Sequence, residues 1–255
     1  MRWSEQQRRL LGAMGVRLFE VPEDAPAAAL ADEAASAPPA SPVPGPGAPV
    51  LRAGSPDERS ARIGRLDWPA LRDAVASCTA CALCESRTQT VFGVGHVQAR
   101  LMVVGEAPGE QEDRQGEPFV GQAGKLLDNM LRAIGLTRDA SAPPAQQVFI
   151  ANTLKCRPPR NRNPDPAETA ACAPYLARQI DLVRPRVLLA MGRFAAQALL
   201  ASDEPIGKLR GRVHRWRDTP VVVTYHPAYL LRTLHDKARA WDDLCLAASL
   251  LEGGE

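Results

Sequence analysis

The sequence predicts a three-layer α/β/α sandwich with a mainly parallel sheet of about four strands. Four short apolar runs, rich in β-branched residues or leucine, occur after residue 66, and each is followed by polar residues, glycine or proline. Amphipathic helical patterns lie between these runs. Strands that are apolar on both faces and alternate with helices are typical of a parallel sheet that helices cover on both sides.

The elements follow one another in a regular order. The predicted strands occupy residues 100–104, 147–151, 186–190 and 220–224. The predicted helices occupy residues 123–134, 166–183, 193–200 and 237–251. Ligands bind such sheets at the carboxyl ends of the strands, so we expect functional side chains there.

The residues before this domain, which we expect to span residues 66–255, have a different composition. Residues 21–65 are dominated by Ala, Pro, Ser, Gly and acidic residues, and they bury too little apolar surface to offset the entropy of ordering. We therefore predict a disordered linker there. Residues 1–20 are predicted to hold a short amphipathic helix, which either docks an unknown partner or has no partner.

Composition limits where the protein works and what it binds. The sequence has no secretory signal and no run of membrane-spanning length, which predicts a cytoplasmic protein. A net charge of +2 does not by itself indicate nucleic acid. Basic residues do cluster in one loop, where they either contact phosphates or reflect a GC-rich genome; they are Lys155, Arg157, Arg160 and Arg162.

Four cysteines have a spacing typical of a metal centre. Cys78 and Cys81 are separated by two residues, and Cys156 and Cys172 by fifteen. In a reducing compartment, six cysteines favour metal binding or reactive thiols over disulfides. Zinc and iron-sulfur clusters both accept four cysteine sulfurs, and the spacing does not choose between them.

Polar residues follow three of the predicted strands. The loop Gly105-Glu-Ala-Pro-Gly109 allows a tight turn whose amides face a ligand, or it is a plain strand-to-helix turn. Asn152 offers one acceptor and two donors, enough to bind an imide edge, or it is a turn former. His226 is either a neutral donor to a developing oxyanion or a histidine bonded to a backbone carbonyl.

Two further groups of residues have an ordinary and a functional interpretation. Phe119 either packs in the core or stacks on a planar ligand. Leu230 and Leu231, followed by Arg232, either begin a packed helix or form a wedge into a base stack with a phosphate anchor.

Taken together, these motifs resemble the family 4 uracil-DNA glycosylases, the iron-sulfur members of their superfamily. The resemblance covers about residues 71–250 and leaves out the first seventy residues. The motifs that carry it are Cys78-Thr-Ala-Cys81, Gly105-Glu-Ala-Pro-Gly-Glu-Gln-Glu-Asp113, Gly116-Glu-Pro-Phe-Val-Gly121, Asn152-Thr-Leu-Lys-Cys-Arg-Pro-Pro159, Asn161-Arg162 and His226-Pro-Ala-Tyr-Leu-Leu-Arg232.

The resemblance implies an α/β/α enzyme that carries a 4Fe-4S cluster and removes uracil from DNA by cleaving the N-glycosidic bond. By matching position it assigns the cluster ligands, which are Cys78, Cys81, Cys156 and Cys172. Cys84 and Cys245 are expected not to be ligands. Because this chemistry transfers no electrons, we expect the cluster to order the basic loop 155–162 for contact with DNA phosphates through Arg157, Arg160 and Arg162.

A base inside a duplex must be flipped out before its glycosidic bond can be cleaved. We expect Leu230, Leu231 and Arg232 to fill or prop the resulting gap. Uracil is expected to lie against Phe119 and to pair with Asn152. His226 and backbone amides of the Glu106 loop, including Ala107 and Gly109, are expected to donate to its O2 as charge develops.

One position differs from the best-known branch of the superfamily, which has a water-activating aspartate where this chain has Ala107. We therefore expect Glu112, or failing that Glu106, to position the water.

Three alternatives remain at this stage. A family 5 enzyme of broader base choice is disfavoured by Glu106, and a covalent uracil-DNA binder is disfavoured because residues 158–162 contain no histidine. A non-catalytic metal-containing DNA-binding module would explain the cysteines and arginines, but it would not need Asn152, Phe119 and His226. The expected enzyme is a monomer that acts on single- or double-stranded DNA.

Overall fold

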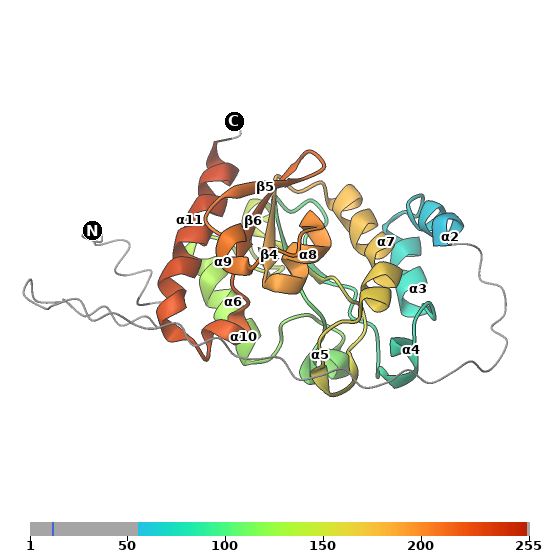
Figure 1. Cartoon of the computed structure of the whole chain (residues 1–255). Coiled ribbons are helices and arrows are strands. Elements are labelled where there is room, and N and C mark those ends of the chain that lie inside the picture. The colour runs from blue at the N-terminus through green and yellow to red at the C-terminus, as the bar shows by residue number, and fades with distance from the viewer. Residues whose placement is uncertain (1–11, 13–55, 254–255) are drawn as a thin grey trace, which may run out of the picture.

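The computed structural model describes residues 12 and 56–253. Residues 56–253 form a six-stranded mixed sheet with helices on both faces (Figure 1). The sheet order is β1-β3-β2-β4-β6-β5. The strands are β1 (Val94–Gly95), β2 (Leu101–Gly105), β3 (Phe149–Asn152), β4 (Val187–Met191), β5 (Val213–Trp216) and β6 (Thr219–Thr224). The predicted fold class and the four predicted strands are confirmed, since β2, β3, β4 and β6 pair in parallel.

The expectation of about four strands was too low, because two antiparallel edge strands complete the sheet. β1 pairs with β3 and β5 pairs with β6. β1 has only two residues, and β5 alternates between exposed and half-buried positions. Neither therefore carries the continuous apolar run that revealed the central strands.

Alternate residues of each central strand enter different cores. In β2, Leu101 and Val103 pack on one face, while Met102 and Val104 pack on the other. This alternation follows from the two-residue period of a strand. Every residue of β2 and β4 is buried, as expected for strands covered on both sides.

Helices supply the two outer layers. α6 and α11 cover one face, and α3, α7 and α8 cover the other (Figure 1). The α-helices are α2 (Pro56–Ile63), α3 (Trp68–Ala76), α4 (Leu83–Ser86), α5 (Glu110–Gln115), α6 (Gln122–Ala133), α7 (Pro166–Val183), α8 (Arg193–Leu200), α9 (Ile206–Leu209), α10 (Pro227–Leu230) and α11 (Lys237–Glu252). Single 3₁₀ turns occur at Pro144–Gln146, Pro159–Asn161 and Leu234–Asp236.

Local sequence explains why α7 has its predicted bounds. The Asp165 side chain accepts a hydrogen bond from the backbone N–H of Ala167, Pro166 occupies the first helical position, and Glu168 completes a capping box. The helix ends where Arg184 adopts a left-handed conformation, with φ of 50°. These signals fix the position of Cys172 on the buried side of the helix.

Helix α2 corrects the boundary of the predicted linker. It lies inside the range 21–65, yet Ile63 is buried and Arg59 donates to the carbonyl of Ala171 in α7. Its sequence PDERSARI contains a single large apolar residue, so it lacked a recognisable periodic pattern. The predicted N-terminal helix and the rest of the linker lie outside the described residues. Among the described helices, none is long and apolar enough to cross a membrane.

Candidate active site and metal centre

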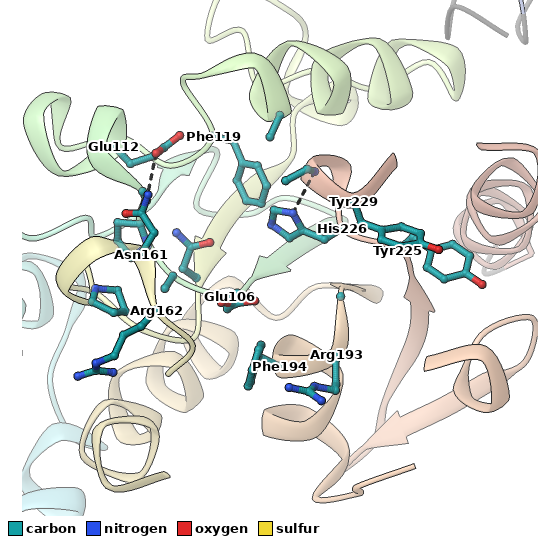
Figure 2. Close-up of a pocket in the computed structure, with 18 of the residues that line it drawn as sticks. Glu106, Glu112, Phe119, Asn161, Arg162, Arg193, Phe194, Tyr225, His226 and Tyr229 are labelled. Carbon is teal, nitrogen blue, oxygen red and sulfur yellow. Dashed lines mark hydrogen bonds between the residues drawn. The ribbon is translucent and has the colours of Figure 1, made fainter. Parts of the chain in front are cut away.

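A cleft of about 660 Å³ opens at the carboxyl ends of the parallel strands (Figure 2). It brings together residues from distant parts of the chain, as the strand-end argument predicted. Every residue predicted to act on the base or the water lines it; they are Glu106, Ala107, Gly109, Glu112, Phe119, Asn152 and His226.

Asn152 ends β3 at the floor of the cleft and is only 2% exposed. Its Oδ1 atom has no hydrogen-bond partner among the described residues. A buried acceptor without a partner costs about 1–3 kcal/mol, so the site is stabilised by a ligand that brings an N–H donor. Gly105 leaves the necessary space, because a Cβ at that position would lie 2.4 Å from this oxygen.

His226 presents a neutral imidazole to the same cleft. It caps α10, and its Nδ1 accepts a hydrogen bond of 3.1 Å from the backbone N–H of Ala228. Burial, aided by the charge of Arg232, lowers the pKa of His226 to about 4. The ring is therefore neutral near pH 7, and with Nδ1 accepting, its proton is on Nε2, where it can be donated to a ligand.

Phe119 forms an aromatic wall against His226. The two ring centroids are 5.4 Å apart and the planes differ by 27°. Phe119 has a φ of 56°, which is uncommon for a bulky residue, and the missing side chain of Gly124 makes room for its backbone. Such a backbone persists only where its surroundings impose it, and it is typical of functional sites.

Glu112 braces the loop that carries the site. Its Oε2 accepts the N–H of Gly109 at 3.1 Å, and its Oε1 accepts those of Val120 and Gly121 at 3.0 and 3.4 Å. Both carboxylate oxygens are therefore engaged, which weighs against Glu112 as the group that positions the water. The amide of Gly109 is engaged as well, so Gly109 shapes the loop but has no free donor for a ligand.

Glu106 differs from Glu112 in its surroundings. Its backbone carbonyl accepts hydrogen bonds from Thr153 Oγ1 and the N–H of Leu154, which fixes the main chain. No hydrogen bond to its carboxylate is found in the described part of the chain. Burial raises the pKa of Glu106, and the nearby positive charge of Arg193 opposes this effect. Glu106 is thus the acidic side chain of the cleft that is free to hold a water molecule.

The basic loop after β3 is only partly available to DNA. Arg157 lies 3.5 Å from a carboxylate oxygen of Glu110, and Arg162 makes a two-pronged ion pair with Glu168. Arg160, with φ of 56°, has no carboxylate within 4 Å in the part of the chain that is described. Arg160 is therefore the best placed of the three predicted phosphate ligands.

Lys155, which the sequence grouped with these arginines, is 1% exposed and cannot reach a phosphate. Its Nζ donates to the carbonyl of Asn152 and to Oε1 of Gln179, both at 2.7 Å. Burial lowers the pKa of Lys155 to about 8. Of the two alternatives for the basic cluster, phosphate contact is ruled out for this residue, because its ammonium group is hydrogen-bonded inside the protein.

The three residues predicted to fill the gap in the DNA differ in exposure. Leu230 is 0% exposed and packs in the core, so its assignment to DNA contact is wrong. It belongs to the single turn α10, which turns its side chain inward. Leu231 is 42% exposed, and Arg232 is exposed at the edge of the cleft. These two remain the candidates for a wedge and a phosphate anchor.

Sequence reasoning missed one wall of the cleft. Arg193 and Phe194 begin α8, at the carboxyl end of β4, and face the cleft across from Phe119 (Figure 2). Arg193 also has no carboxylate within 4 Å among the described residues. The rule that ligands bind at strand ends would have found both residues, had it been applied to this third parallel strand as well.

A second cavity collects cysteines. Cys78, Cys81, Cys156 and Cys172 line it, and so does Cys84, which was expected not to be a ligand. Protein donors point at three of the sulfurs. Arg59 lies 3.8 Å from the sulfur of Cys78, Arg87 lies 3.2 Å from that of Cys156, and the N–H of Lys155 lies 3.3 Å from that of Cys172.

These thiols have the chemistry of ligands that need a metal to become charged. Burial raises the pKa of Cys172 to about 12, and it raises those of Cys81 and Cys156 as well. Only a bound cation would keep them as thiolates near neutral pH. In the described residues no three His, Cys, Asp or Glu side chains meet around one point that a single ion could occupy. Cysteines from distant segments that line one cavity are a donor set that zinc and iron-sulfur clusters share.

Comparison with known proteins gives a consistent result. Residues 92–245 match the family model of the Uracil DNA glycosylase superfamily. A type-4 uracil-DNA glycosylase of Sulfurisphaera tokodaii is 44% identical over 170 residues, which cover 63% of this chain and 74% of the relative. One of Archaeoglobus fulgidus is 45% identical over 165 residues, covering 62% and 79%. A type-5 enzyme of Thermus thermophilus is 36% identical over 119 residues, covering 44% and 54%.

Proposed function

The chain belongs to the type-4 branch of the uracil DNA glycosylase superfamily and excises uracil from DNA in base excision repair. We propose that it hydrolyses the N-glycosidic bond of deoxyuridine in the cleft and leaves an abasic site. Asn152 and His226 together support uracil as the base that the cleft binds. The buried, unpaired Oδ1 of Asn152 lies in the same cleft as the donor His226. An acceptor and a donor together match the imide edge of uracil, which has both N–H and C=O groups.

Uracil enters the cleft after its nucleotide leaves the base stack. We propose that it lies against Phe119, gives its N3–H to Asn152 Oδ1 and accepts at O4 from the Asn152 amide. Its O2 accepts from Nε2–H of His226 and from the backbone N–H of Ala107. As the bond breaks, uracil becomes an anion, so these donors bind the transition state more strongly than the substrate.

We place Glu106 ahead of Glu112 as the residue that positions the water. The oxygens of Glu112 are already held by three backbone amides, whereas the Glu106 carboxylate faces the cleft without a hydrogen bond in the described structure. An ionised Glu106 would accept a hydrogen bond from the water and stabilise the positive charge that develops on the sugar.

We assign contact with DNA to three exposed arginines that have no carboxylate within 4 Å among the described residues. Arg193 and Arg232 line the cleft, and Arg160 lies in the loop after β3. Leu231, exposed next to Arg232, is the apolar side chain that would enter the stack where the uridine has left. The ion pairs of Arg157 and Arg162 instead hold the loop after β3 in shape.

We propose that Cys78, Cys81, Cys156 and Cys172 hold a 4Fe-4S cluster. When bound, the cluster would cross-link the loop before α4, the loop after β3 and helix α7. Arg59 and Arg87 would offset the negative charge of its thiolates. Holding Cys156 in place would also position Asn152 and the basic loop 155–162, because both are close to Cys156 in the sequence.

We also propose that the protein acts as a monomer in the cytoplasm. The cleft is complete within one chain, and all six cysteines are free thiols, as a reducing compartment requires.

Incubation with an oligonucleotide that contains one uracil, followed by alkali, tests the function. The expected result is strand cleavage at the uracil and nowhere else, with no cleavage before alkali, because a monofunctional glycosylase leaves the backbone intact. A matched oligonucleotide with thymine serves as control. Intact uracil strands after incubation with folded, iron-containing protein would overturn the proposal.

A further inference from the structure

Cys84 belongs to the cysteine cavity although no role was expected for it. It follows Cys81 at the same two-residue spacing that separates Cys81 from Cys78. A Cys-x₂-Cys-x₂-Cys run is the pattern by which some 4Fe-4S clusters receive three consecutive ligands. Here the run stands beside Cys156 and Cys172, so that five thiols line one cavity. A 4Fe-4S cluster needs only four.

The backbone places Cys84 next to Cys81. The N–H of Cys84 donates to the carbonyl of Cys81 at 3.2 Å, which closes a single turn at the start of α4. In a turn of this kind, side chains three residues apart lie on the same side. Both thiols are half-buried, whereas Cys156 and Cys172 are buried on the segments opposite.

The cysteine sulfurs differ in the donors that hold them. Protein N–H groups already point at Cys78, Cys156 and Cys172, which fixes those three sulfurs in place. The sulfur of Cys81 accepts instead from the backbone N–H of Leu83, in the same short turn that carries Cys84. The fourth position of the cavity is therefore held by one turn that carries two thiols, and either thiol can fill it.

We propose that Cys84 is a reserve ligand of the cluster and exchanges with Cys81. The inference rests on the proposed cluster. In the exchange the incoming thiol releases its proton as it bonds to iron, and the departing thiolate takes one up. Four thiolates stay on the cluster throughout, and no electron is transferred. A half-exposed ligand is the one that solvent oxidants reach first, so a neighbouring substitute preserves the cluster when Cys81 is lost.

The test measures iron and acid-labile sulfide per chain, with visible absorbance, in full-length proteins purified without oxygen. The variants are C81A, C84A and C81A/C84A. We expect C84A to hold as much iron as wild type, C81A to keep most of it, and C81A/C84A to hold several-fold less than C81A. The matched pair C172A and C172A/C84A should show equal iron, because Cys84 lies beside Cys81 and not beside Cys172.

Equal iron in C81A and C81A/C84A, whether high or low, would overturn the proposal. A second measurement needs no change at Cys81. When the holoproteins are exposed to peroxide, C84A should lose its visible absorbance at least about twofold faster than wild type, whereas C245A should match wild type; equal rates for C84A and wild type also overturn it. Uracil release by wild type tests the proposed function, and iron in wild type tests the cluster, so each failure is recognised separately.

Discussion

The cleft and the cysteine cavity share the segment 152–156 but treat their polar atoms in opposite ways. At one end of the segment, Asn152 leaves a buried oxygen without a partner. At the other end, Cys156 accepts a hydrogen bond from Arg87, and Lys155 bonds through both its N–H and its ammonium group. The cleft thus leaves a polar atom free for a ligand that binds and leaves, whereas the polar groups beside the cavity already have protein partners, as the proposed cluster would require.

This difference separates catalysis from support. A resident group needs neighbours that fix its ligands and offset its charge, and the cavity supplies Arg59, Arg87 and Lys155 for that purpose. A transient substrate needs groups whose best partners appear only in the complex. The two regions should therefore respond differently to substitution.

The largest effect is expected from Cys156→Ala. Removing a buried ligand should release the iron, and the loss of several kcal/mol would lower Tm by roughly 10 °C or more in a domain of this size. DNA binding and uracil excision should be lost with it. Thermal unfolding, iron content and excision are measured together, with Cys245→Ala, an exposed thiol in α11, as control. A folded, iron-free and fully active Cys156→Ala would show that the cavity does not support the site.

A smaller effect, confined to the cleft, is expected from Gly105→Ala. The new Cβ would lie 2.4 Å from Asn152 Oδ1 and 2.7 Å from Cζ of Phe119, so both side chains must shift. We expect the excision rate to fall by roughly tenfold to hundredfold, about 1.4–2.7 kcal/mol, while the iron content stays unchanged. Gly207→Ala, where a Cβ meets nothing within 4 Å, is the matched control. Loss of iron in Gly105→Ala would contradict the claim that a change in the cleft leaves the cysteine cavity intact.

Still smaller effects are expected from the exposed arginines assigned to DNA contact. Arg160→Ala and Arg232→Ala should each raise KM several-fold without changing iron content. Each should also reduce the slope of log affinity against log salt by about 1, because one phosphate contact is lost. Arg217→Ala, whose side chain pairs with Asp181 outside the cleft, should bind DNA as wild type does. Unchanged salt slopes would remove these arginines from the DNA interface.

The smallest expected effect is that of pH between 6 and 8. Because burial holds the pKa of His226 near 4, below the usual value of 6.5, the ring stays neutral through this range. The dependence of kcat/KM on pH should therefore show no inflection from His226. The free energy of unfolding does not depend on His226 above about pH 6.5. It decreases as pH falls toward 4, because the unfolded chain takes up a proton that the buried ring resists. An inflection near pH 6.5 that disappears in His226→Gln would contradict this assignment.

Much of the fold could be predicted from the sequence because its signals are local. The buried strands are continuous apolar runs, and α7 is delimited by Asp165, Pro166 and Glu168 at its start. The edge strands β1 and β5 and the helix α2 were missed because they bury few side chains. Their conformation depends on what they pack against, which no local pattern records.

Only those site residues that lie at strand ends could be predicted reliably from the sequence. Asn152 and His226 were found because the first ends a strand and the second lies two residues past the end of one. The inward orientation of Leu230 and the burial of Lys155 depend on how a turn is oriented against the core. Sequence spacing does not reveal that orientation, and a lysine among arginines resembles one more surface cation.

The most direct test of the central claim compares uracil release by wild type and Asn152→Ala at equal iron content, in single turnover with saturating DNA. The account predicts that Asn152→Ala keeps the visible absorbance and has a Tm no lower than that of wild type, because a buried unpaired oxygen is removed, but releases uracil about 10²–10³-fold more slowly, as for the loss of one strong transition-state contact. Uracil release at the wild-type rate by iron-loaded Asn152→Ala would contradict the claim that the cleft performs the chemistry through this side chain.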